Sequence, residues 1–548
     1  MPTQADQIWF NAQIDTMDPT CPRATALAVR NGRLIAVGSD EAVTVLAGPG
    51  TAMRDMGELF LMPGLVESHT HALWGACRDL FEVFVGYDEE FSVLLGAIKE
   101  RAAATEPGRS IAGGPWRPDM RDQMGSCPRR LLDAITTVHP VILKDVSHHI
   151  VWCNSLALEK AGLTAETSDI PGGIVERDET GTPTGILAEA ASAPVQALLN
   201  WAPEQLAEGC RYFVRYFNRM GITAFKEPMA YEPELSTYHA ADQSGDLTLH
   251  GAAHIARTSP ASITPMAYEE MERLSDRYAS NNLRTRFAKL FLDGVAPGFT
   301  ASFLDPYLAE SGYDAAGHDP DATLLIAPRE LDVTVMELDR RGFVVKMHAV
   351  GDNAIRKGLD AIETTRRTNG PSGLRHEIAH SAFVSDADLP RFRALDAVAE
   401  ISPKLWYPNP ATAAQVAVLG RGRMARLHRV RDLLRAGAEV ICASDWPAAA
   451  PDANPWTGLA GLISRRNATR AHEGAINPEQ AIPLPEALRL YTVNGARSLG
   501  MENETGSLET GKWADFIVLN KNPENLDYVE IGATQVRETW WKGRQVYG

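Results

Sequence analysis

The sequence contains little of what a disulfide framework, a thiolate metal site or a membrane span requires. Its six cysteines are scattered through 548 residues, and none belongs to a Cys-x-x-Cys pair, which argues against both disulfides and cysteine-bound zinc. No run of about 18 or more apolar residues occurs, and the N-terminus lacks the charged and apolar segments of an export signal. We therefore expect a cytoplasmic protein that is neither exported nor inserted in a membrane.

Clusters of lysine and arginine are also missing. The chain carries 53 Lys and Arg against 70 Asp and Glu, a net charge of -17, so neither a nucleic acid nor an anionic membrane is an expected partner. Apolar residues make up 45% of the chain and charged residues 22%, which is typical of a globular protein. This length exceeds one ordinary core, so we expect several domains or one large barrel with additions.

The feature around which the sequence is organised is His69-Thr70-His71, which follows the largely apolar run at residues 61–68. In a β-strand, side chains two positions apart face the same way, so both imidazoles could bind one metal ion. The pair alone could equally be a chance occurrence in a loop. The residues downstream decide between these two interpretations.

Both ends of the chain consist of short strand-like segments. Residues 6–60 include the hairpin turn signal Asn31-Gly32, because both positions of such a turn need a positive φ. Residues 506–548 are similar, with Gly and Asn-Pro between the segments. Neither end has enough strands to bury a core alone, so we expect residues 1–62 and 500–548 to form one small β-sandwich.

Residues 63–499 alternate strand-like apolar runs with helical stretches, the pattern of βα units around a parallel sheet. Together with the His-x-His strand, seven further strands make eight, the number that closes a (β/α)8 TIM-like barrel with its chemistry at the C-terminal strand ends. The fold class we predict is therefore α/β. The seven strands are Ile222–Glu227, Leu247–Ile255, Phe287–Asp293, Phe343–Ala349, His376–Ser381, Val398–Pro403 and Val440–Asp445.

The connection between the first and second predicted strands is far longer than an ordinary βα loop. It contains helical and apolar segments, so we expect an ordered insertion at about residues 78–220 that covers the mouth of the barrel. Potential metal ligands lie on the predicted strands, most of them near the C-terminal ends. They are His69 and His71 on strand one, Lys289 on strand four, His348 on strand five, His380 on strand six and Asp445 on strand eight.

With these residues in this order, the chain resembles the amidohydrolase superfamily, and within it the YtcJ-like amidohydrolase family 3, which includes N-substituted formamide deformylases. The resemblance covers almost the whole chain and implies a metal-dependent hydrolase acting on carbon–nitrogen bonds other than peptide bonds. Its motifs are PGLVESHTH, KLFLDGVAPGFTASFLDPY, VKMHAVGDNA, RHEIAHS, SDWP, YTVNGARSLG and GSLETGKWADFIVL.

The resemblance also implies a role for each candidate ligand. His69, His71 and Asp445 would hold one divalent ion, and Lys289 would bridge to a second ion as a carbamate formed with carbon dioxide. Imidazole and carboxylate ligands suit zinc. We expect two zinc ions per chain if Lys289 is carboxylated and one if it is not. The further ligands of the second ion would be His348 and His380.

Several different assignments stay open for these roles. Lys289 could instead pair with Asp293, the ordinary fate of a buried lysine. His376 would share a strand face with His380 and is the rival ligand there. The rival bridging residues, on strand two, are Lys226 and Glu227.

The chemistry implied is hydrolysis of an amide-type bond, N-acyl or N-formyl, by attack of metal-bound hydroxide. Asp445 would be catalytic, accepting the proton of the hydroxide and passing it to the departing nitrogen. One alternative is a deaminase of a heterocycle that uses a single metal and leaves Lys289 uncarboxylated. A less favoured one is a catalytically inactive binding protein, which would normally have lost a ligand.

Aromatic residues near the predicted mouth favour a small-molecule substrate with an apolar or aromatic part. Such residues fill cores equally well, so a packing role is the alternative for each. No sequence feature marks a subunit interface, and a homodimer is left open. The expected substrate-binding residues are Trp74, His149, Trp152, Phe299 and Trp446.

Overall fold

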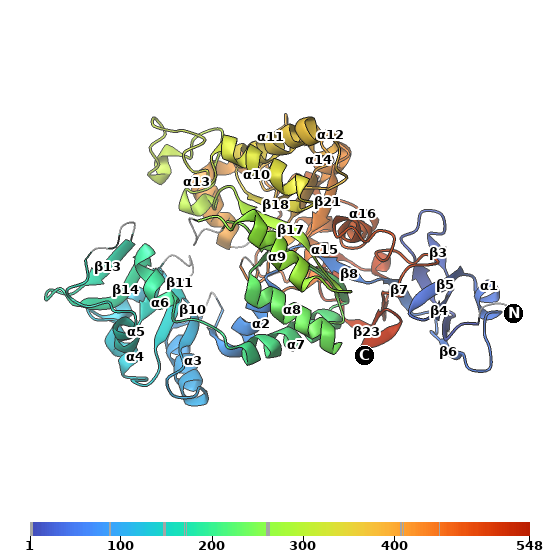
Figure 1. The fold of residues 1–548 in the computed structure, drawn as a ribbon, viewed down its shortest axis with the longest axis horizontal. Coiled ribbons are helices and arrows are strands. Elements are labelled where there is room, and N and C mark those ends of the chain that lie inside the picture. Colours follow the sequence, from blue (N-terminus) through green and yellow to red (C-terminus); the bar gives the residue numbers. More distant parts are fainter. Residues whose placement is uncertain are drawn as a thin grey trace. The chain divides into compact units, whose positions relative to one another are not determined.

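A computed structural model describes residues 4–86, 89–145, 150–168, 170, 173–258, 264–405, 408, 410–448 and 450–548. The chain separates into two compact units (Figure 1). Unit 1 consists of residues 1–72 and 210–548, and unit 2 of residues 73–209. Within the described residues, none of the helices combines the length and apolarity that crossing a membrane would demand.

Unit 1 contains a nearly closed barrel of eight parallel strands in the order β21-β20-β19-β18-β17-β16-β15-β8, which confirms the predicted fold class. The eight predicted strands are all present, with shifted ends. The largest consequence is that His69 and His71 lie just beyond the first strand instead of in it. The strands are β8 (Leu65–Glu67), β15 (Ile222–Ala230), β16 (His250–Ala256), β17 (Leu283–Phe291), β18 (Val344–Ala349), β19 (Glu377–His380), β20 (Val398–Ile401) and β21 (Glu439–Cys442).

Helices cover the outside of the barrel sheet (Figure 1). In the helix at Asp352–Asn369, for example, Ile355, Leu359 and Ile362 recur at helical spacing and are all buried, as expected for a stripe that packs on a sheet. The helices are α7 (Pro203–Arg219), α8 (Glu232–Ser244), α9 (Tyr268–Tyr278), α10 (Pro328–Arg340), α11 (Asp352–Asn369), α12 (Leu389–Ala394), α13 (Pro410–Met424), α14 (Val430–Arg435), α15 (Pro455–Ser464), α16 (Leu484–Leu490), α17 (Val493–Ser498) and α18 (Tyr528–Gly532).

The interior of the barrel changes from apolar to charged along the strands. An apolar layer contains Val66, Ala224, Ala252 and Phe287, and is completed by Leu499 and Met501. Because side chains two positions apart share a face, the next inward side chain on each strand lies two residues further along. Those positions carry charged or titratable groups, among them Lys226, His254, Lys289 and Lys346, and all four are buried.

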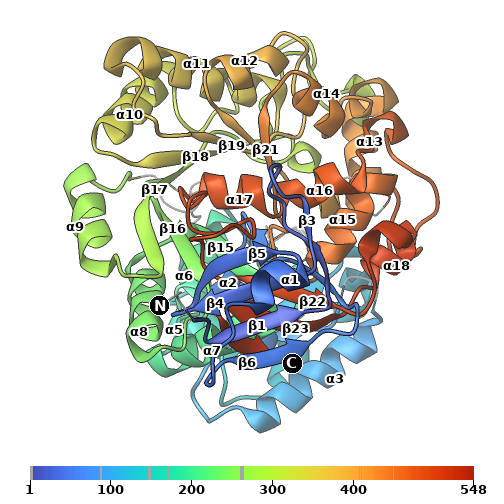
Figure 2. The same ribbon diagram turned by 90° about the vertical axis from the view of Figure 1, so that its right-hand side faces the viewer.

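The two ends of the chain share a second core within unit 1. Strand β7 pairs antiparallel with β22 from the C-terminal part, and Trp9 makes edge contacts with Phe516 and Trp540. Figure 2 shows the N-terminal strands, in blue, stacked on the C-terminal ones, in red. The sheets β5-β4-β1-β6 and β24-β23-β22-β7-β2-β3 are the expected terminal sheets.

These terminal sheets consist of short elements. The strands are β1 (Gln7–Phe10), β2 (Gln13–Asp15), β3 (Arg23–Ala24), β4 (Ala26–Arg30), β5 (Arg33–Gly38), β6 (Ala52–Asp55), β7 (Phe60–Pro63), β22 (Phe516–Leu519), β23 (Val536–Trp541) and β24 (Arg544–Tyr547), and the helix is α1 (Asp40–Thr44).

Unit 2 has a sheet and core of its own. Its strand order is β13-β14-β12-β11-β10-β9, and apolar residues lie on both faces, because Leu143 belongs to one apolar cluster and Ile142 to another. The strands are β9 (Val83–Phe84), β10 (Ile111–Trp116), β11 (Val141–Asp145), β12 (Ile150–Cys153), β13 (Gly173–Arg177) and β14 (Pro183–Glu189); the helices are α2 (Ala72–Phe81), α3 (Phe91–Ala104), α4 (Arg129–Asp133), α5 (Ser155–Lys160) and α6 (Ala193–Gln196).

The shared terminal core predicts that a substitution near the C-terminus weakens the whole of unit 1. Phe516→Ala would empty a fully buried position and is expected to lower the free energy of unfolding by about 3–5 kcal/mol. Val45→Ala, at a side chain 72% exposed, should change it by less than about 0.5 kcal/mol. Urea unfolding followed by circular dichroism measures both, and equal midpoints for the two variants would contradict the shared core.

Candidate metal centre

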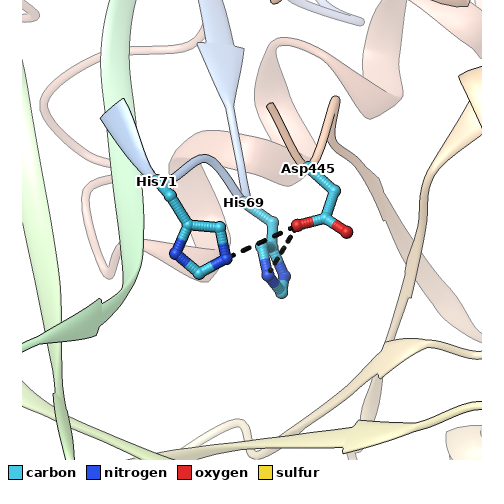
Figure 3. A group of neighbouring side chains, drawn as sticks. All are labelled: His69, His71 and Asp445. Carbon is cyan, nitrogen blue, oxygen red and sulfur yellow. Dashed lines mark ion pairs between the residues drawn. The ribbon is translucent and has the colours of Figure 1, made fainter. Parts of the chain in front are cut away.

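His69, His71 and Asp445 form a buried cluster at the C-terminal end of the barrel, with one ligand atom from each within 4.8 Å of the others. Asp445 Oδ1 lies 3.5 Å from Nε2 of His69 and 3.6 Å from Nε2 of His71, and both imidazoles face it (Figure 3). Ligand atoms about 2.1 Å from one tetrahedral ion lie about 3.4 Å apart. Both distances from Asp445 Oδ1 are therefore suited to one divalent ion held by these side chains.

Backbone contacts place these three residues. The N–H of Asp445 donates to the carbonyl of His69 at 2.9 Å, and the N–H of His71 donates to the carbonyl of Trp446 at 2.8 Å. Between the two histidines, the N–H of Thr70 donates to the carbonyl of Lys226 at 3.1 Å. The His-x-His segment is thus held between β15 and the residues that follow β21, although it lies beyond β8.

Two more of the predicted ligands lie beside this cluster. The ring centres of His348 and His380 are 4.5 Å apart, and those of His380 and His69 are 5.0 Å apart. Burial and the charge of Lys289 together lower the pKa of His348 to about 3 and that of His69 well below its usual value. The imidazoles are therefore neutral, the form that binds a metal ion.

Lys289, the sixth predicted ligand, is buried without a carboxylate partner among the residues that the structure describes. Its Nζ lies 4.8 Å from the centre of the Phe291 ring. Burial lowers the pKa of this amine, although the charge of Glu400 opposes the shift. The same burial raises the pKa of Asp445.

The alternative prediction that Lys289 pairs with Asp293 is wrong. The Asp293 carboxylate instead accepts the backbone N–H groups of Ser302, Val350 and Gly351 at 2.9–3.0 Å. Backbone N–H groups thus satisfy the buried Asp293 carboxylate, which does not pair with Lys289.

The rival ligands are placed differently from the cluster: the side chains of Lys226 and His376 pair elsewhere, and Glu227 lies behind His71, 3.5 Å from its Nδ1. Lys226 forms an ion pair with Glu377, whereas the Tyr238 hydroxyl donates to Glu227 Oε2 at 2.8 Å. His376 immediately precedes β19, and its Nδ1 accepts the N–H of Val345 at 3.1 Å. Its Nε2 lies 3.1 Å from Asp339 Oδ1, so both ring nitrogens are occupied away from the cluster.

A chain of buried charges inside the barrel was not predicted from the sequence. Lys226 pairs with Glu377, whose second oxygen lies 3.1 Å from Lys346 Nζ, and Lys346 also pairs with Glu400. All four side chains are fully buried. The available signal was a charged residue inside an otherwise apolar parallel strand, because such strands are normally apolar throughout.

The predicted substrate-binding residues fall into different environments. Trp152 is fully buried and stacks on Phe91 in the core of unit 2, and the ring of Trp446 is fully buried with its centre 5.5 Å from that of Tyr216. These positions favour a packing role for both tryptophans. Half-buried Phe299 follows β17, half-buried Trp74 lies on α2, and His149 lies outside the described residues.

Comparison with known proteins agrees with this geometry. A family model described as the amidohydrolase family matches residues 53–547. Protein LONG AFTER FAR-RED 3 of Arabidopsis thaliana is 28% identical, over 99% of this chain and 92% of that protein. The N-substituted formamide deformylase of Arthrobacter pascens is 27% identical, over 99% of this chain and 98% of that enzyme.

Solved structures show the same fold. A metal-dependent hydrolase from Pyrococcus horikoshii superposes with a TM-score of 0.77 at 23% identity, covering 95% of this chain and 99% of that one. A metal-dependent hydrolase from Pyrococcus furiosus gives a TM-score of 0.75 at 21% identity, covering 95% and 100%. Both comparisons cover 95% of this chain and show a shared fold.

The cluster predicts tight binding of a divalent ion that depends on Asp445. Asp445→Asn removes the only anionic member of the three and is expected to weaken Zn²⁺ binding by more than about 100-fold. This exceeds the effect of losing a residue that only hydrogen-bonds to a metal ligand, which is about 10–100-fold. Asp386→Asn, at a side chain 85% exposed, serves as the matched control. Competition with a chromogenic chelator measures both affinities, and equal affinities would remove Asp445 from the centre.

Proposed function

Because this chain belongs to the amidohydrolase family and is a hydrolase, we propose that it cleaves an amide-type C–N bond, N-acyl or N-formyl, in a small molecule. The observation that carries the proposal is the buried group of His69, His71 and Asp445 at the C-terminal end of the barrel, where barrel enzymes place their chemistry. The likeness to a formamide deformylase over nearly the whole chain supports an N-formyl bond.

The proposed centre takes divalent ions, most suitably zinc, because its side chains offer nitrogen and oxygen ligands. His69, His71 and Asp445 would hold one ion, and His348, His380 and a modified Lys289 would hold a second. An ion there supplies a Lewis acid that polarises a carbonyl and acidifies water.

Asp445 is the residue we propose to move the proton. Its Oδ1 faces the two histidines, whereas Oδ2 is directed away from them (Figure 3). Burial raises the pKa of this carboxyl above its usual value, which brings it closer to the range suited to proton transfer near neutral pH. Oδ2 would accept a proton from the attacking water and return it to the departing nitrogen.

The proposal predicts a defined product and a need for metal. Incubation with a panel of N-formyl and N-acyl derivatives of aliphatic and aromatic amines should release the free amine and the carboxylic acid. Removal of metal by a chelator should abolish release, and Zn²⁺, Mn²⁺ or Co²⁺ should restore it.

Two outcomes would contradict this assignment. Undiminished activity in protein verified as metal-free by elemental analysis would exclude the proposed centre. Release of ammonia from an aminated heterocycle, with no cleavage of any amide, would favour the single-metal deaminase.

Lys289 is the residue we propose to be carboxylated. A buried ammonium without a counter-charge is unfavourable, and burial lowers the pKa of Lys289, which populates the neutral amine. That amine would attack the carbon of CO₂ to form a carbamate and release one proton. Counting the proton that the ammonium loses first, two protons leave in all, and a positive charge is replaced by a negative one on two oxygen atoms that can bind metals.

Isotopic labelling tests the carbamate. With ¹³C-bicarbonate and zinc, the wild-type protein should give one slowly exchanging carbamate carbon signal by NMR, and Lys289→Met should lose it. Lys226→Met should keep the signal, because Lys226 pairs with Glu377 elsewhere in the barrel.

Activity offers a second test of the same residue. Lys289→Ala should lose more than about 90% of turnover through loss of an ion that assists catalysis, and short carboxylic acids should restore part of it. A carbamate signal that survives Lys289→Met would overturn the assignment.

A further inference from the structure

The two imidazoles of the His-x-His segment each contact a buried glutamate on the side away from Asp445. Nδ1 of His69 lies 2.6 Å from Glu400 Oε1, and Nδ1 of His71 lies 3.5 Å from Glu227 Oε1. Both Nε2 atoms face Asp445. Each ring therefore has one nitrogen toward the metal position and the other toward a carboxylate.

The contact at His69 decides where the ring carries its hydrogen. A carboxylate only accepts hydrogen bonds, so a neutral imidazole 2.6 Å away must carry its hydrogen on Nδ1. The competing acceptor, Asp445 Oδ1, is 3.5 Å from Nε2, too far for a strong bond. Nε2 is then left with the lone pair that a metal ion needs.

Glu400 is itself held in place. Its Oε2 pairs with Lys346, and Nζ of Lys346 also donates to the carbonyl of Ser68 at 2.8 Å. One ammonium thus fixes both the carboxylate behind His69 and the backbone immediately before His69. Both oxygens of Glu400 are engaged by these contacts, which leaves Glu400 unsuited to bind the ion directly.

Glu227 lies behind His71 as Glu400 lies behind His69, but at a longer distance. Glu227 Oε2 accepts the Tyr238 hydroxyl at 2.8 Å, but the distance from Oε1 to His71 is 3.5 Å. A hydrogen bond of this length is marginal. The difference between the pairs predicts that Glu400 has the greater influence on the metal site.

We propose that Glu400, anchored by Lys346, is a positioning residue that fixes His69 as its Nδ1–H tautomer and aims Nε2 at the metal position. The role in metal binding rests on the proposed function, whereas the tautomer can be measured in the metal-free protein. Carboxylate partners of this kind commonly change metal affinity about 10–100-fold.

The substitution Glu400→Gln tests this role. Glutamine keeps the size of the side chain but can present either an acceptor or a donor to Nδ1, and Lys346 retains Glu377 and the Ser68 carbonyl. In metal-free protein with ¹⁵N-labelled histidine, we expect a single Nδ1–H tautomer for wild-type His69 and a mixture for the variant. A His69→Gln spectrum assigns the signal.

Zinc affinity provides the second readout. Glu400→Gln should weaken Zn²⁺ binding about 10–100-fold, and Glu227→Gln should weaken it less. Glu377→Gln is the matched control, because Glu377 is equally buried and pairs with the same Lys346 but does not contact His69. This control should lose stability without a comparable loss of affinity.

Glu400→Asp guards against a variant that does not fold, since it keeps the negative charge beside Lys346 but withdraws it from His69 by one methylene. It should show the same tautomer mixture in a folded protein. An unchanged tautomer in both Glu400 variants, or equal losses of affinity in Glu400→Gln and Glu377→Gln, would overturn the proposal.

These readouts also separate this proposal from the proposed hydrolysis, because neither measurement uses a substrate. A fixed tautomer with Glu400-dependent zinc binding would support the positioning role even if no amide is cleaved. If amides are cleaved, Glu400→Gln at saturating zinc should lower kcat with little change in KM.

Discussion

The backbone hydrogen bonds that join the exits of β8 and β21 are the constraint on which the metal centre depends. The first and last strands of the barrel meet through the N–H of Ser68 on the carbonyl of Cys442 and the N–H of Asp445 on the carbonyl of His69. Glu67 strengthens this junction, because its Oε1 accepts the N–H groups of His69 and Ser444. Burial raises the pKa of Glu67 to about 8, although these backbone hydrogen bonds lower it. Closing the barrel and assembling the three ligands are therefore one structural event.

The two ends of the chain brace the same junction. Strand β7 runs into β8 through Gly64, where a Cβ would lie 2.2 Å from Thr223 Oγ1, so the first barrel strand can approach its neighbour only with glycine there. Because β7 also pairs with β22, the C-terminal residues fix the approach of the strand that leads to His69. This explains why two short β segments at opposite ends of a long chain share one apolar core.

The sequence was sufficient to predict the repeated part of this structure, the strands of the barrel. Eight apolar runs predicted the barrel strands, and the candidate ligands on five of them included His69, His71 and Asp445, which the structure brings together. It was insufficient for Glu400 on β20, because its contact with His69 joins residues 331 positions apart, and His69 follows β8, which is not a neighbour of β20 in the sheet. A glutamate in an apolar strand indicates that a partner exists but not which one. Trp152 and Trp446 were ambiguous for a different reason, since an aromatic ring suits a core as well as a pocket.

The balance of charge inside the barrel connects these observations. Lys226, Lys289 and Lys346 are buried on β15, β17 and β18. Among the described residues, Glu377 and Glu400 form ion pairs with Lys226 and Lys346 but not with Lys289. A barrel filled with apolar side chains would be at least as stable as one with such pairs, so stability alone does not account for them. Their geometry does, because Glu400 contacts both Lys346 and His69, whereas Lys289 forms no direct ion pair within the part of the chain that the structure describes. Conversion of Lys289 to the proposed carbamate would supply negative charge to balance two divalent ions.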